Sequence, residues 1–230
     1  NDNLSIGLRK YLHPKARFCW FDICHLAVHK LAEVFREYGT EWIFMAAAVP
    51  YVPDGFDNPL HTFDVTATGV LRVLEAARIA NIRGTLVVSS AEIFGSSVSG
   101  AVSEKTEVFP HSTYAAAKQA ADSLVQVRWH EAGVRSLAAR QFNSYGPRCL
   151  HPLVLTTIID QLSQGPQIKL GNNTTRDFQF CTDTVRIWVE LLESERWGEV
   201  VNCGSESFIK IYDLARLVGS LMGYGEQIEI

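Results

Sequence analysis

The chain of 230 residues is long enough to bury a substantial core in one or two domains, and its 47% hydrophobic and 20% charged residues are typical of a globular protein. A formal net charge of −4 offers no large basic surface that could neutralise phosphates, so we expect no nucleic-acid partner. No apolar run reaches the roughly 18 residues that a membrane-spanning helix needs, so we expect no membrane partner.

Short apolar runs alternate with longer helical patterns along the first part of the chain. The expected strands are 16–23, 41–48, 84–90 and 134–142. The expected helices are 26–39, 63–81 and 112–133. This alternation predicts an α/β fold with a Rossmann-like, doubly wound parallel sheet. Run 41–48 is apolar throughout, as expected of a strand that is covered on both faces.

The sequence changes in character after about residue 143, where longer loops occur. The elements expected there are helices near 153–164, 182–193 and 210–222, and a strand at 199–204. We therefore expect one domain over 1–142 and, over 143–230, mainly a smaller lobe from which some segments return to the first domain. The chain starts at NDNLS, which is typical of the end of a strand, and closes on EQIEI, which is typical of the start of one. We accordingly expect a piece of a longer chain.

Five cysteines, an odd number without a CxxC pair, favour a reduced cytoplasmic protein with unreactive thiols over a disulfide framework. His25 and His29 have helical spacing, but the HLAVH stretch lacks the glutamate of a zinc-protease helix and has no evident third ligand. We therefore expect no metal site.

A tyrosine stands four residues before a lysine twice in this chain. In YLHPK, Pro14 disfavours helical geometry between Tyr11 and Lys15, so these two side chains are not expected to share a helix face. In STYAAAKQ nothing interrupts the helix, and the spacing of four places Tyr114 and Lys118 on the same side, one turn apart. Only the second pair can act together.

Polar side chains follow two of the expected strands directly. The stretch SSAEIFG (89–95) supplies the hydroxyl of Ser90 and the carboxylate of Glu92, and RQFNSYGPR (140–148) supplies Asn143. A doubly wound sheet places its ligands beyond the carboxyl ends of its strands. The tyrosine–lysine helix starts between these two stretches, so the sequence predicts a site at this edge.

Ten short motifs occur in order and with fitting spacing. They are DNLS (2–5), FDI (21–23), FMAA (44–47), NP (58–59), GVLRVLEAAR (69–78), SSAEIFG (89–95), TYAAAK (113–118), RQFNSYGPR (140–148), RDF (176–178) and VVNCGS (200–205). In these motifs the chain resembles the extended branch of the short-chain dehydrogenase/reductase family, the NAD-dependent nucleotide-sugar epimerases and dehydratases. The family's Gly-rich phosphate loop is not found in the 230 residues, and Thr66 stands where the family commonly has Asn.

The resemblance assigns catalytic roles to three residues. It makes Tyr114 the general acid/base that takes the proton from a sugar hydroxyl as hydride leaves for the nicotinamide, and Ser90 the hydrogen-bond partner of the oxygen that becomes a ketone. Lys118 is expected to bind the nicotinamide ribose. Because a free tyrosine has a pKa near 10, the ammonium of Lys118 and the oxidised nicotinamide are expected to lower it.

The same resemblance implies a site for the cofactor NAD. It places Asp2 at the adenosine ribose hydroxyls, where an acidic residue favours NAD over NADP. It places Asp22 and Ile23 beside adenine, and the two alanines of FMAA, Ala46 and Ala47, among the residues that contact the cofactor. The first domain is thus expected to bind NAD.

The resemblance also implies a nucleotide-sugar substrate, which the second lobe is expected to bind. Arg176 matches an arginine that pairs with the substrate diphosphate, as suits a planar bidentate donor. Asn143, and Ser90 from the first domain, are expected beside the same substrate. The family further implies a homodimer that pairs helices 63–81 and 112–133.

The choice of reaction depends on the triplet Ser90-Ala91-Glu92. A carboxylate at the position of Glu92 favours a 4,6-dehydratase, in which it removes the proton beside the new ketone, and stretch 168–186 is also most similar to dehydratases. Ala91 weakens this assignment, because some dehydratases have an Asp there. A 4-epimerase and a UDP-glucuronate decarboxylase stay open, as do a non-catalytic NAD- or nucleotide-sugar-binding module and an oligomerisation partner of an active relative.

Overall fold

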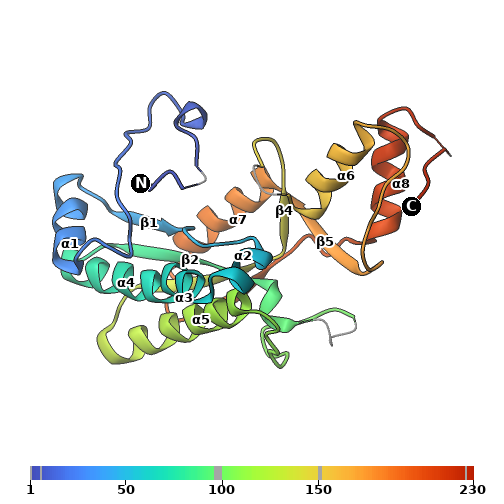
Figure 1. Ribbon diagram of the computed structural model, residues 1–230. Coiled ribbons are helices and arrows are strands. Elements are labelled where there is room, and N and C mark those ends of the chain that lie inside the picture. Colours follow the sequence, from blue (N-terminus) through green and yellow to red (C-terminus); the bar gives the residue numbers. More distant parts are fainter. Residues whose placement is uncertain (1, 6, 96–99, 150–151, 226) are drawn as a thin grey trace. The chain divides into compact units, whose positions relative to one another are not determined.

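The chain forms two compact units in a computed structural model, which describes residues 2–5, 7–95, 100–149, 152–225 and 227–230 (Figure 1). The first unit comprises Asn1–Gln141 and Val185–Cys203, and the second comprises Phe142–Thr184 and Gly204–Ile230. Helix α7 (Cys181–Glu193) carries the chain from the second unit to the first.

The first unit contains a four-stranded parallel sheet in the order β1-β2-β3-β6. Its strands are β1 (Trp42–Met45), β2 (Gly84–Ser90), β3 (Ser136–Gln141) and β6 (Val200–Cys203). The register between the two central strands places Ser89 opposite Arg140 and Ser90 opposite Gln141. The predicted α/β class with a parallel sheet is confirmed.

Helices α1, α4 and α5 cover one face of this sheet, as Figure 1 shows. The helices of the unit that precede β3 are α1 (Val28–Glu37), α2 (Val52–Asp57), α3 (Pro59–Phe63), α4 (Gly69–Ala80) and α5 (Thr113–Ala132). Ser112 starts α5, because its hydroxyl accepts a hydrogen bond from the amide of Ala115 at 3.1 Å. Gly133, with a φ of +62°, ends it in the left-handed conformation that glycine adopts without strain.

The two faces of the sheet contribute to separate hydrophobic clusters. Val87 and Ala138 pack with α1, α4 and α5, whereas Leu86 and Leu137 pack with the later residues of α7, among them Leu192. Neighbouring residues of a strand therefore point to opposite faces, and both faces of the central strands are covered.

Three expectations for the first unit are wrong in detail. Segment 16–23 is no strand but makes one parallel bridge, Asp2 with Trp20, and a strand requires pairing along its length. The strand expected over 41–48 is only β1, where Phe44 is 45% exposed. The helix expected from 63 starts at Pro59 and includes a π-helical turn at Asp64–Thr68.

Helix α2 was not predicted from the sequence. Pro53 lies in the first turn of α2, and Pro59 likewise lies in the first turn of α3. A proline is tolerated there, because the first amides of a helix have no partner within it. Prolines here mark the starts of helices.

The second unit is built on a three-stranded sheet in the order β4-β5-β7. Its strands are β4 (Asn143–Tyr145), β5 (Thr175–Phe180) and β7 (Phe208–Lys210), and its further helices are α6 (Val154–Leu162) and α8 (Ile211–Leu221). Strand β5 pairs parallel with β4 and antiparallel with β7. Ile158 and Leu162 of α6 pack against Leu214 of α8. The helices were predicted, but the short strands were not.

None of the helices in the described part of the chain is long and apolar enough to cross a membrane.

A pair of identical substitutions tests the core. Leu74→Ala on α4 removes a side chain with no exposed surface, and we expect a loss of about 2–5 kcal/mol in the free energy of unfolding. Leu60→Ala on α3 alters a side chain that is 84% exposed, and we expect a change of less than about 0.5 kcal/mol. Urea denaturation measures both, and equal losses would contradict the described packing.

Candidate active site

Ser90 ends β2 and fixes the turn that follows it. Its hydroxyl accepts a hydrogen bond from the amide of Glu92 at 3.2 Å and so caps the 3-10 turn Ala91–Phe94. The Ser90 side chain is buried, whereas Glu92 is exposed. The turn therefore places a carboxylate that solvent or a ligand can reach beside a buried hydroxyl.

Tyr114 and Lys118 lie one turn apart on α5 and are both buried. The side chain of Ser90 lies close enough to the hydroxyl of Tyr114 to lower the pKa of this phenol. The ammonium of Lys118 lies 5.6 Å from the centre of the Tyr114 ring and donates a hydrogen bond to the carbonyl of Val88 on β2. The structure therefore brings three predicted residues together, with Glu92 adjacent.

Tyr11 and Lys15, the other tyrosine–lysine pair, do not share a helix, as predicted. Tyr11 ends the 3-10 turn Arg9–Tyr11, and Lys15 lies in a following turn, where its amide donates to Nδ1 of His13 at 3.2 Å. No helix spans residues 11–15.

Burial dominates the ionisation of the pair. It raises the pKa of Tyr114 to about 12; the hydrogen bond with Ser90 lowers this pKa, and the charge of Glu92 raises it. Burial also lowers the pKa of Lys118 to about 8, against the charge of Asp122, which raises it. We expected Lys118 to lower the pKa of Tyr114. This is wrong in the protein without a cofactor, where the pKa is raised. The ammonium lies over the ring and is bonded to a carbonyl, so it does not offset the burial of the hydroxyl.

Two charged residues beside this pair were missed in the sequence. Asp122 follows Lys118 by one helical turn, and Arg140 lies in the buried strand β3. Nε of Arg140 donates to Oδ2 of Asp122 at 2.8 Å, and both side chains are at most 10% exposed. An arginine within a strand that is otherwise uncharged was the signal, because such a buried charge requires a partner.

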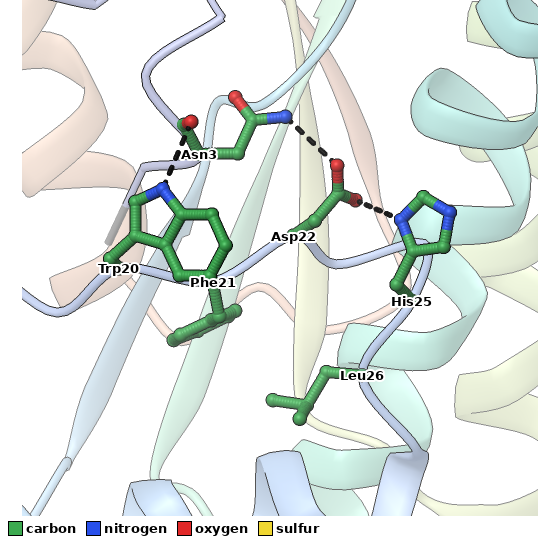
Figure 2. Close-up of a pocket in the computed structure, with 6 residues that line it drawn as sticks. All are labelled: Asn3, Trp20, Phe21, Asp22, His25 and Leu26. Carbon is green, nitrogen blue, oxygen red and sulfur yellow. Dashed lines mark hydrogen bonds and ion pairs between the residues drawn. The ribbon is translucent and has the colours of Figure 1, made fainter.

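The start of the chain forms an open pocket of about 450 Å³ (Figure 2). Its lining residues are Asn3, Trp20, Phe21, Asp22, His25 and Leu26. The indole of Trp20 donates to the carbonyl of Asn3 at 3.2 Å, and the amide of Asn3 donates to Oδ2 of Asp22 at 2.9 Å. Apolar walls and a single fixed carboxylate suit a flat aromatic ring that carries a hydrogen-bond donor.

Asp22 is prepared to act as an anionic acceptor. Partial burial alone would raise the pKa of this carboxyl, but hydrogen bonds from Asn3 and from the amide of Cys24, together with the nearby His25, lower it below its usual value. Ile23 beside it is buried. The carboxylate therefore stays charged through the neutral pH range.

The remaining residues expected at the cofactor lie elsewhere in the first unit. Asp2 is exposed and pairs with Trp20 in the isolated bridge, while its Oδ1 accepts from the amide of Leu4 at 2.5 Å. Ala46 and Ala47 follow the carboxyl end of β1 and are exposed. Ala46 and Ala47 thus lie at a strand end, whereas Asp2 does not, and the contact of all three residues with a cofactor stays a prediction.

Asn143 and Arg176 lie on the neighbouring strands β4 and β5 of the second unit. The amide of Asn143 donates to the carbonyl of Asp177 at 2.9 Å. The side chain of Asp177, which sequence reasoning also missed, accepts from the amides of Ser205 and Glu206 and from the Ser205 hydroxyl at 2.7–3.0 Å. Asp177 thus ties the VVNCGS stretch to β5 and fixes the segment that carries Arg176.

Within the described residues, no group of three or more His, Cys, Asp and Glu side chains is arranged to hold a metal ion. Nδ1 of His25 instead lies 3.6 Å from Oδ1 of Asp22. Burial and the carboxylates of Asp64 and Asp22 raise the pKa of the Cys24 thiol to about 12, so this cysteine stays protonated.

A family model and individual relatives assign the chain to the same group of proteins. The sequence model of the family described as GDP-mannose 4,6 dehydratase matches residues 2–217. GDP-6-deoxy-D-mannose reductase of Pseudomonas aeruginosa is 30% identical over 185 residues, which are 76% of this chain and 61% of the relative. dTDP-D-glucose 4,6-dehydratase of Homo sapiens is 26% identical over 202 residues, which are 87% of this chain and 57% of the relative. The chain thus spans less than two thirds of the length of these relatives.

The fold is shared with solved enzymes. The structure of UDP-glucose 4-epimerase with UDP-glucose from Thermotoga maritima matches with a TM-score of 0.87 at 24% identity, over 99% of this chain and 75% of that chain. At this identity the match shows a common fold.

Lys118 should lower the stability of the protein. Because its pKa falls from 10.5 to about 8, the folded state binds this proton less tightly than the unfolded state. We expect Lys118→Met to raise the free energy of unfolding at pH 7 by up to about 3 kcal/mol, at about 1.4 kcal/mol per pKa unit. The stability of the wild type should rise as the pH increases from about 8 towards 10.5, whereas the variant should lack this rise.

Urea denaturation at several pH values measures this difference. Lys30→Met, at a lysine whose side chain is 57% exposed, serves as the control and should change little. Equal stabilities of Lys118→Met and the wild type at pH 7 would contradict the described burial.

Proposed function

Because the chain belongs to the GDP-mannose 4,6 dehydratase family, we propose that it acts as an NAD-dependent nucleotide-sugar 4,6-dehydratase through a transient 4-keto sugar. The observation that carries the proposal is the grouping of Ser90, Tyr114 and Lys118 with the exposed carboxylate of Glu92. A binding module has no need of such an acid/base set, which favours an enzyme.

The residues of the first unit fit NAD. The pocket between Trp20 and Leu26 has the apolar walls and the ionised acceptor, Asp22, that an adenine ring and its amino group require. Asp2 is available for the ribose hydroxyls, and Lys118 for those of the second ribose. When bound, NAD would supply hydride-transfer chemistry without being consumed in the turnover.

Tyr114 exchanges the proton of the sugar's 4-hydroxyl in this proposal. With a pKa of about 12 it is neutral and is suited to donate. To accept a proton, it requires positive charge close to its oxygen, and Lys118 is the cation that faces its ring. Ser90, whose side chain influences the pKa of this phenol, would hold the sugar oxygen that becomes the ketone.

Glu92 distinguishes dehydration from the alternatives. Removal of water requires a second base, which takes the proton beside the ketone before the 6-hydroxyl leaves. Glu92 is exposed, yet close enough for its charge to raise the pKa of Tyr114, so a sugar bound at Tyr114 would lie within its reach. Since Ala91 cannot donate a proton, Glu92 would also return the proton to the leaving hydroxyl.

The second unit would supply the contacts to the nucleotide part of the substrate. Arg176 has the planar, bidentate donor that a diphosphate requires, and Asp177 stabilises the segment around it. Asn143 is already bonded to the Asp177 carbonyl, so it would contact the substrate through its remaining polar groups. The homodimer through helices 63–81 and 112–133 also remains a proposal.

Tyr114→Phe tests the mechanism. It removes one oxygen and should reduce turnover by about 10²- to 10⁴-fold, the range for loss of a general acid/base. The assay is mass spectrometry of a panel of nucleotide sugars incubated with NAD and the full natural chain. Tyr11→Phe, the matched control, should retain normal turnover. Normal turnover in Tyr114→Phe would rule the mechanism out.

Glu92→Gln tests the reaction type. Under the proposal the wild type removes one water from its substrate, and the variant fails to do so while still passing hydride to NAD, which absorbance of the reduced cofactor reports. Glu131→Gln, at an exposed carboxylate near the far end of α5, should behave as the wild type. A wild-type product of unchanged mass would instead indicate a 4-epimerase, and loss of carbon dioxide from a uronic acid would indicate a decarboxylase.

A further inference from the structure

Three charged side chains alternate in sign between α5 and the sheet. Lys118 and Asp122 are four residues apart and therefore share one face of the helix, and Arg140 bonds the Asp122 carboxylate from β3. All three residues are at most 8% exposed. Buried charges are rare unless they are paired, so the presence of Lys118 on the helix face that carries the Asp122–Arg140 pair requires an explanation.

Arg140 is fixed by more than its bond to Asp122. Its guanidinium lies 5.3 Å from the centre of the Phe94 ring, and Nη1 donates to the carbonyl of Glu104 at 3.3 Å. The carboxylate of Glu104 in turn accepts from the amide of Asn202 on β6 at 2.9 Å. The arginine therefore holds the Asp122 carboxylate at one place on α5.

Lys118 is fixed from the sheet side, where it donates to the Val88 carbonyl. The register between β2 and β3 sets Ser89, the next residue, opposite Arg140. The ammonium is thus anchored on β2 and the guanidinium comes from the adjacent strand β3, where it bonds Asp122 of α5.

Few charges face Lys118 from the elements that pack on α5. They are Tyr114 and Asp122 on α5 itself, Glu92 in the turn after β2, and Arg140 on β3. Strand β2 contributes only hydroxyl groups near the site.

Other charged residues of the neighbouring elements are engaged elsewhere. The carboxylate of Asp64, in the π-helical turn, faces Cys24, and Glu75 on α4 pairs with Arg128. His61, Asp54 and Asp57 on α2 and α3 are exposed.

We propose that Asp122 is a positioning residue, whose carboxylate, fixed by Arg140, keeps the buried Lys118 ammonium charged beneath Tyr114. Burial alone lowers the pKa of Lys118, and the negative charge of Asp122 is what opposes this lowering. A carboxylate that only joined α5 to β3 would leave the ionisation of Lys118 unchanged. The consequence for catalysis rests on the proposed function, whereas the ionisation of Lys118 does not.

The test is a titration of Lys118 by NMR, in protein labelled with ¹³C at lysine Cε, with the signal assigned by its loss in Lys118→Arg. The wild type should titrate near pH 8. Asp122→Asn keeps an acceptor for Arg140 but removes the charge, and should move the midpoint down by about 1 to 3 pH units. Asp122→Glu should restore it, and Glu131→Gln on the same helix should not move it. An unchanged midpoint in folded Asp122→Asn would overturn the proposal.

A second measurement uses the unaltered protein, in case Asp122→Asn does not fold. The ¹³Cγ signal of Asp122 should show an inflection at the pH at which Lys118 titrates, because the two charges interact. Its absence would overturn the proposal.

In Asp122→Asn, the alkaline limb of the pH profile of turnover should shift by the same number of pH units as the NMR titration midpoint of Lys118. A limb that stays in place while the midpoint moves would overturn the catalytic role. If no nucleotide sugar is turned over at all, the proposed function fails, and the two titrations still decide the ionisation of Lys118.

Discussion

The parallel pairing of β2 with β3 beneath α5 is the constraint on which the site depends. It sets Ser89 opposite Arg140 and brings the end of β2, with Ser90, to the start of the helix. A slip of one residue would turn every side chain of a strand to the other face and would separate Arg140 from Asp122. The tight packing of small residues at this place, among them Ala138, leaves no room for such a slip.

The grouping of charges under α5 is costly, and the fold compensates for this cost with apolar burial on both faces of the sheet. Lys118 loses its hydration on entering the core and recovers a carbonyl contact, the face of the Tyr114 ring and the field of one carboxylate. Such a lysine is a poor choice for stability, since an apolar side chain of similar volume would pack there without this penalty. Under the proposed function the ammonium adds positive charge beside a phenol that has to accept a proton, although on its own it does not offset the burial of that phenol.

Sequence reasoning succeeded where local patterns decide the structure. The Ser112 cap and the Gly133 stop delimit α5, and the four-residue spacing places Tyr114 and Lys118 one turn apart within it. It failed where pairing with distant residues decides, as in segment 16–23 and in the three-residue strand β4, because periodicity cannot be read from so few residues. The direction of the Tyr114 pKa shift was also out of reach, since it depends on burial.

Tyr114 is buried and Glu92 is exposed, and this difference suits the two groups to different acid/base steps of the proposed reaction. The ionisation of the buried Tyr114 hydroxyl depends on the charge around it, so under the proposed function it would respond to the charge of the cofactor. The exposed carboxylate of Glu92 can exchange protons with water at any stage. A single hydride transfer and its reversal, as in epimerisation, need only the first kind of group. Elimination of water also moves a carbon-bound proton onto a leaving hydroxyl, and the second kind of group suits that step, so the pairing of both kinds favours dehydration in the proposed function.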